Sequence, residues 1–104
     1  MEGRMTLNSS CYPIPEPSVV GKTMENGEAV LVLPGKGQVK VLNEIAARIW
    51  ELADGTRSVA QIAEAITEAY QVGEQQAEQD VWDFLNNLAS IGLLQLADDP
   101  KGRG

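Results

Sequence analysis

The fold of this chain is decided in residues 29–53, which read AVLVLPGKGQVKVLNEIAARIWELA. Up to Leu42 the sequence has short β-branched runs and alternating polar and apolar residues, which are typical of strands. From Asn43 onward, apolar residues recur every three or four positions, as they do on the buried face of a helix. The chain is therefore expected to change from sheet to helix at this point, with Asn43 capping the helix.

Three strands are predicted before the change. Residues 19–24 and 28–33 are interpreted as two strands joined by Glu25-Asn26-Gly27, whose Asn-Gly pair is typical of a tight hairpin. The turn Pro34-Gly35-Lys36-Gly37 leads to a third strand over Gln38–Leu42. Because this strand comes last in the meander, we expect it to lie at a sheet edge, with one row of backbone groups unpaired.

Three helices are predicted after the sheet. The first ends at Asp54-Gly55-Thr56, and Ser58-Val59-Ala60-Gln61 has the pattern of a capping box that begins the second. The third covers residues 74–91 and stops at Gly92, after which residues 93–96 form either a short strand or an apolar tail. The predicted fold class is α+β, a winged helix-turn-helix-like arrangement of a three-stranded antiparallel meander followed by three α-helices.

The 104 residues suffice for one domain. Prolines at positions 13, 15 and 17 remove amide donors, so residues 1–17 are predicted to be a flexible arm and not a strand. Residues 18–97 are predicted to form the folded domain and residues 98–104 a disordered tail. Neither a secretory signal nor an apolar run long enough to span a membrane is evident, so the expected compartment is the cytoplasm.

The charges are unevenly distributed along the chain. The net charge is −7, and all eight basic residues lie outside residues 58–100. A protein that binds nucleic acid needs Lys and Arg to displace counterions from phosphates, so neither of the last two helices suits DNA recognition. A basic peptide would be attracted instead.

The sequence offers little for catalysis. It has no His, which is the commonest general base, and its single Cys11 has no partner for a disulfide or a zinc site. Gly35-Lys36-Gly37 is interpreted as a hairpin turn and not a phosphate loop, because no helix begins there. We therefore predict a protein that is not an enzyme and holds no metal or cofactor.

Residues 39–59, VKVLNEIAARIWELADGTRSV, resemble the central signature of the PqqD-like family, "LNE.AA.IWEL.DG.RTV..I". Later segments are similar to the family at matching order and spacing, including residues 80–85 and 92–94, so that the resemblance covers residues 19–96. It implies a recognition element for ribosomally made, post-translationally modified peptides (RiPPs). In this family the leader of a precursor peptide adds as an extra strand beside the third strand, in a groove beside the third helix.

The resemblance implies a set of peptide-binding residues, which come from the third strand and the third helix: Gln38, Val39, Lys40, Val41, Leu42, Glu78, Val81, Trp82 and Leu85. We expect large apolar leader side chains to enter a pocket formed by Val81, Trp82 and Leu85. Alternatively, Val81 and Leu85 are plain core residues, and Trp82 packs against the first strands. Lys40 either protects the edge strand from aggregation or contacts an acidic leader residue.

The implied partners are a precursor peptide and a modifying enzyme, such as a radical SAM protein or a leader-cleaving protease, with no cofactor. Lasso-peptide, radical SAM peptide and redox-cofactor pathways all fit this description. Two other classes stay open: a structural or regulatory subunit of an enzyme complex, and a winged-helix DNA binder. An unpaired edge strand can also pair with its own copy, so a homodimer is possible as well.

Overall fold

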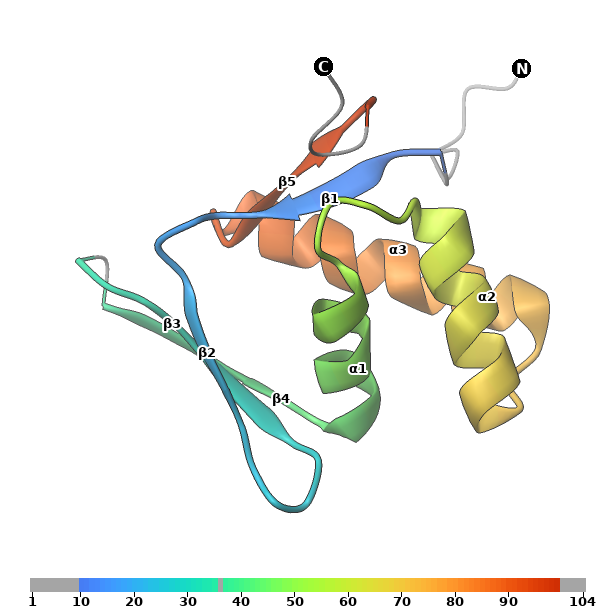
Figure 1. Cartoon of the computed structure of the whole chain (residues 1–104), viewed down its shortest axis with the longest axis horizontal. Helices are drawn as coiled ribbons and strands as arrows, with labels where there is room; N and C mark the ends of the chain where they lie inside the picture. Colours follow the sequence, from blue (N-terminus) through green and yellow to red (C-terminus); the bar gives the residue numbers. More distant parts are fainter. Residues whose placement is uncertain (1–9, 36, 100–104) are drawn as a thin grey trace.

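The computed structural model describes residues 10–35 and 37–99. A three-stranded antiparallel sheet is followed by three helices, which confirms the predicted α+β class (Figure 1). In chain order the elements are β1 (Tyr12–Pro15), β2 (Val20–Thr23), β3 (Ala29–Leu33), β4 (Gln38–Leu42), α1 (Glu44–Leu52), α2 (Val59–Tyr70), α3 (Glu74–Ser90) and β5 (Leu94–Ala97). Among the described helices, none is long and apolar enough to cross a membrane.

The predicted hairpin joins β2 to β3. Gly27 has a φ of 92°, a left-handed conformation that favours glycine. The Asn26 side-chain oxygen accepts a hydrogen bond of 3.0 Å from the backbone N–H of Glu28, which fixes the turn. The strand order is β2-β3-β4, so β3 is the central strand, as the meander predicts.

The helix ends follow the predicted local signals. The Asn43 side chain accepts a 2.8 Å hydrogen bond from Ala46 N–H at the start of α1, and Ser58 and Gln61 form both bonds of the capping box on α2. At the end of α3, Gly92 has a φ of 86°, and Leu93 N–H donates to the carbonyl of Leu88 over 3.0 Å. These contacts stop α3 and turn the chain back toward β5.

The predicted flexible arm is wrong for residues 12–15, which form β1. This strand pairs antiparallel with β5, with Tyr12 opposite Ala97 and Pro15 opposite Leu94. The two strands form a ribbon of their own, separate from the β2-β3-β4 sheet (Figure 1). Residues 1–9 of the predicted arm and 100–104 of the predicted tail lie outside the described residues.

The prolines in β1 are compatible with pairing because their spacing matches the strand period. Glu16 N–H donates to the carbonyl of Leu93 over 2.9 Å. In an antiparallel pair only alternate residues turn their backbone groups toward the partner, so Pro13 and Pro15 fall at positions that face away from β5. The missing N–H groups therefore cost no bond to β5, and the Pro13 side chain is fully buried.

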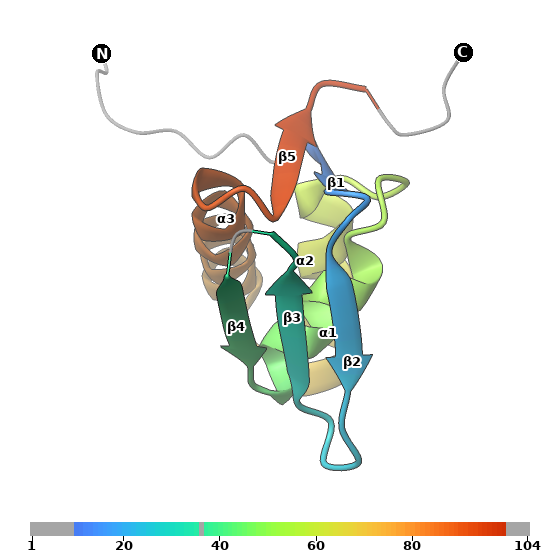
Figure 2. The ribbon, with the colours of Figure 1, turned by 90° about the vertical axis from the view of Figure 1, so that its left-hand side faces the viewer.

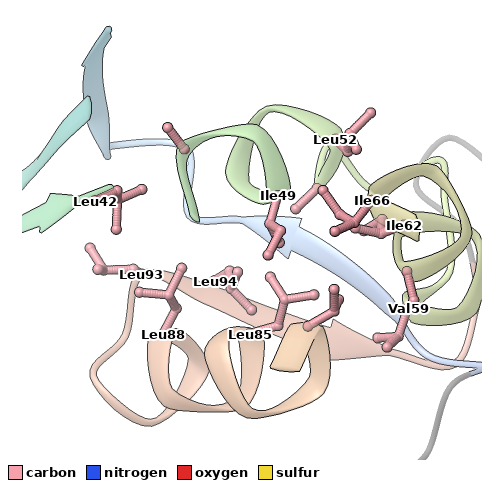
Figure 3. Packing of buried hydrophobic residues seen from close by; sticks show 14 of the residues in the cluster. Leu42, Ile49, Leu52, Val59, Ile62, Ile66, Leu85, Leu88, Leu93 and Leu94 are labelled. Atoms are coloured by element: carbon pink, nitrogen blue, oxygen red, sulfur yellow. The ribbon is translucent and has the colours of Figure 1, made fainter. Parts of the chain in front are cut away.

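One hydrophobic core connects the sheet, the three helices and the β1–β5 ribbon. Leu31, Ile62, Leu85 and Leu88 are each 0% exposed. At the sheet end of the core, Leu42 from β4 faces Leu88 and Leu93 (Figure 3). The end of β4 is therefore anchored in the core, and the rest of β4 extends away from it.

Candidate functional site

β4 is an edge strand of the sheet. It pairs with β3 on one side only, and β3 separates it from β2 (Figure 2). Within the described chain, no strand pairs with its outer side. The N-terminal strand β1 pairs with β5 instead, so it leaves this side of β4 unoccupied.

The hairpin determines which backbone groups point away from the sheet. Met24 N–H donates to the carbonyl of Glu28 over 2.7 Å, so these residues form a hydrogen-bonded pair between β2 and β3. Hydrogen-bonded pairs alternate along an antiparallel ladder. Val30 and Val32, two and four residues after Glu28, therefore turn their backbone groups toward β2, and Leu31 turns its groups toward β4.

The same alternation continues into β4. Leu31 is opposite Lys40, so the backbone groups of Lys40 bond to β3. Those of its neighbours, Val39 and Val41, must point the other way. The outward N–H and C=O groups of Val39 and Val41 form what we call the open edge of β4. Two donors and two acceptors at the spacing of a β-ladder can accept one further extended segment.

The side chains of β4 differ sharply in exposure. Val39 and Val41 are 63% and 65% exposed, although both are apolar. Gln38 is also exposed, Lys40 is half-buried, and Leu42 is buried in the core. The five predicted strand residues are thus contiguous, and four of the five have side chains accessible to a ligand.

The helical part of the predicted site is arranged differently. Val81 and Leu85 are 1% and 0% exposed and belong to the core, which confirms the alternative interpretation of both as core residues. Their side chains offer no surface to a ligand. Trp82 is half-buried and packs against the core, and its predicted contact with a leader stays a prediction.

Glu78 lies on the α2 side of α3. It lines a cavity of about 430 Å³ between α2 and α3, together with Glu64, Glu68 and Glu74. Trp82 is four residues from Glu78 and thus only about 40° from it around the helix, on the same flank. The opposite flank carries the half-buried Phe84, about 160° from Trp82. The spacing of Phe84 from Val81 and Leu88 matches the apolar stripe of the helix, so its partial exposure is not evident from the sequence.

A second cavity of about 320 Å³ lies between β2 and α1. Trp50 from α1 is half-buried at the wall of this cavity. A side chain at Gly21 would come within 3.3 Å of the Trp50 ring nitrogen, so the glycine allows the ring to pack close to β2. Trp50 therefore covers the helix-facing side of the sheet at β2, the edge strand opposite β4.

Two titratable groups of the described residues have shifted pKa values, and both shifts have structural causes. Burial raises the pKa of the Cys11 thiol, and the nearby Asp98 carboxylate adds to the effect, so Cys11 resists forming a nucleophilic thiolate. The hydrogen bond from the Thr56 hydroxyl lowers the pKa of Asp54, helped by the Thr56 N–H and by Arg57. Asp54 thereby stabilises the turn between α1 and α2. No group of three or more potential metal ligands occurs within the described residues.

Comparison with known proteins gives one family match. Residues 28–94 match the family described as Coenzyme PQQ synthesis protein D (PqqD). The matched region includes β3, β4 and all three helices, and it ends at the first residue of β5. A search of curated proteins found no match.

Three solved structures are similar to this chain. TbiB1 in complex with the TbiA(beta) leader peptide is 28% identical with a TM-score of 0.71, covering 88% of this chain and 98% of that one. Lasso peptide synthetase B1 complexed with the leader peptide is 26% identical with a TM-score of 0.70, covering 79% and 95%. The PqqD truncation of Methylobacterium extorquens PqqCD, described as a stand-alone RiPP recognition element, is 25% identical with a TM-score of 0.72, covering 86% and 95%.

Proposed function

This chain belongs to the PqqD family, and on that premise we propose that it binds the leader region of a ribosomally synthesised precursor peptide by β-strand addition at the open edge of β4. The single observation that carries the proposal is the pair of outward-facing residues Val39 and Val41 on an edge strand whose outer side has no partner strand in the described part of the chain. Two of the similar structures, TbiB1 and lasso peptide synthetase B1, are themselves complexes with leader peptides, which supports the same ligand class here.

The open edge supplies part of the affinity. Four backbone hydrogen bonds at a net 0.5 to 1.5 kcal/mol each contribute about 2 to 6 kcal/mol, before the cost of ordering the peptide. Backbone bonds are also insensitive to the peptide sequence, so they cannot select one precursor. Side-chain contacts on either side of the added strand must therefore provide the remaining affinity and the specificity.

The proposed role is presentation of the leader and not catalysis. The Cys11 thiol is buried, which raises its pKa, and among the described residues that line the α2–α3 cavity the four glutamates have no His or Lys beside them to act as a catalytic partner. The chain would hold the leader while a partner enzyme, such as a radical SAM protein, a lasso-peptide enzyme or a leader-cleaving protease, acts on the precursor. We expect this to take place in the cytoplasm.

Titration with a synthetic leader peptide of its precursor tests the proposal, with amide hydrogen exchange followed residue by residue. The amides of Val39 and Val41 should become protected when the leader binds. The amide of Lys40 serves as an internal control, because it is already bonded to β3 and should change little. Binding without new protection at Val39 and Val41 would place the leader elsewhere, and absence of binding would refute the function itself.

A further inference from the structure

The polarity of β4 is inverted relative to the core. Gln38 and Lys40 share the face of the strand that carries the buried Leu42, whereas Val39 and Val41 lie on the opposite face. A strand with one face on the core normally places its apolar residues there and its polar residues toward solvent. In β4 the two valines instead are the most exposed large apolar side chains of the described chain.

The inversion continues across the sheet. The register places Val39 beside Val32 and Val41 beside Val30, and Val20 on β2 is opposite Val32. Cross-strand partners point to the same face, so one face of the sheet carries five valines, which we call the valine face: Val20, Val30, Val32, Val39 and Val41. The helices lie on the other face of the sheet, where Leu31 is buried (Figure 2).

The open edge determines where the side chains of an added strand would lie. If the added strand runs antiparallel to β4, the residues that bond to the backbone of Val39 and Val41 place their side chains on the same face as these two valines. The residue between them is opposite Lys40 and points to the helix side of the sheet. An added segment would thus touch the valine face with every second side chain, and Lys40 with the one between.

Resting on the proposed function, we infer that the leader is read on the valine face: it carries apolar, preferably β-branched, side chains at two positions two residues apart, packed against Val39 and Val41. An acidic residue lies between these positions, opposite Lys40. The added strand then covers the exposed flanks of the two edge valines, and the acid forms a cross-strand ion pair. This assigns the selective apolar contacts to the face away from α3, where Val39 and Val41 are exposed, and not to Val81 and Leu85, which are closed inside the core.

The protein side of the inference is tested with the double variant V39T/V41T. Threonine keeps the β-branched shape and the strand propensity but replaces a methyl group by a hydroxyl. The matched control is V20T, because Val20 lies on the same face and is 58% exposed but belongs to β2, at the far edge. We expect the double variant to bind the leader about three- to tenfold more weakly, the size of two lost cross-strand contacts, and V20T to bind as the wild type does.

The second measurement locates the contact directly. Nuclear Overhauser effects between the valine methyl groups and the bound leader should appear for Val39 and Val41 and not for Val20. Unchanged affinity in V39T/V41T, or an equal loss in V20T, or a bound leader without methyl contacts to Val39 and Val41, would each overturn the inference. These outcomes leave the proposed function standing, whereas a wild-type chain that does not bind the leader would refute the proposed function.

Discussion

A proline scan of two adjacent residues tests the assignment of the open edge, because Val39→Pro and Lys40→Pro should have opposite effects. The N–H of Val39 points away from the sheet, so a proline ring there removes no bond of the β3–β4 ladder. The N–H of Lys40 points toward Leu31, so a proline at that position breaks the ladder. One variant should therefore lose its ligand and the other its stability.

The expected losses of leader affinity and of folding stability follow from the hydrogen bonds that each proline removes. V39P removes one hydrogen bond to the leader and leaves a leader carbonyl facing a ring without a donor, a loss of about 1.5 to 3 kcal/mol. That loss corresponds to roughly ten- to hundredfold weaker binding. K40P leaves the Leu31 carbonyl without its partner inside the sheet, so we expect its free energy of unfolding to fall by about 1 to 3 kcal/mol.

Two assays separate the effects. Isothermal titration calorimetry gives the leader affinity of each folded variant, and urea denaturation followed by far-UV circular dichroism gives the free energy of unfolding. If V39P binds the leader as tightly as the wild type, the N–H of Val39 does not bond to the leader. The assignment of the open edge also fails if V39P is destabilised as much as K40P, because the outward and inward residues of β4 would then be exchanged.

Three further predictions concern charge, packing and pH. Lys40→Glu should weaken leader binding about threefold or more at low salt and by less at high salt, as fluorescence anisotropy can show. If the variant lost the same affinity relative to the wild type at both salt concentrations, an ion pair would be excluded. Leu85→Ala should lower the free energy of unfolding by about 2 to 5 kcal/mol in urea, because the side chain is fully buried; a smaller loss would contradict its place in the core. Because burial raises the pKa of Cys11 in the folded state, its contribution to stability is present below the ordinary thiol pKa and is lost as the pH rises through the folded value. As the pH rises above the ordinary thiol pKa of about 8.5, the urea midpoint should accordingly fall more steeply in the wild type than in Cys11→Ala, and parallel profiles would contradict this.

The parts of the fold that could be predicted from the sequence are those set by local signals. The Asn26-Gly27 turn, the Asn43 cap and the Ser58 capping box each depend on contacts within a few residues, and all are present. β1 could not be predicted in this way, because its partner β5 lies some 80 residues later in the chain. The alternating prolines, interpreted as strand breakers, are compatible with a strand that has a partner on one side only.

The candidate site shows the same division. The edge position of β4 follows from the order of the strands, so the sequence could locate it. The helical half could not be located, because the flank of α3 that faces each neighbour depends on how the helices pack. Glu78 lines a cavity that it shares with residues of α2. The apolar spacing of Val81 and Leu85 is compatible with a core stripe and with a binding surface, and only their burial in the structure distinguishes the two.

The pairing of Tyr12 with Ala97 has a consequence for how this domain can be built into larger proteins. The start of β1 and the end of β5 lie side by side in the β1–β5 ribbon, away from the β2–β3 hairpin of the main sheet (Figure 1). An enzyme fused ahead of the domain and one fused behind it would therefore be tethered at nearly the same point. Gene fusion in either order can thus keep the same distance between a catalytic unit and the open edge of β4.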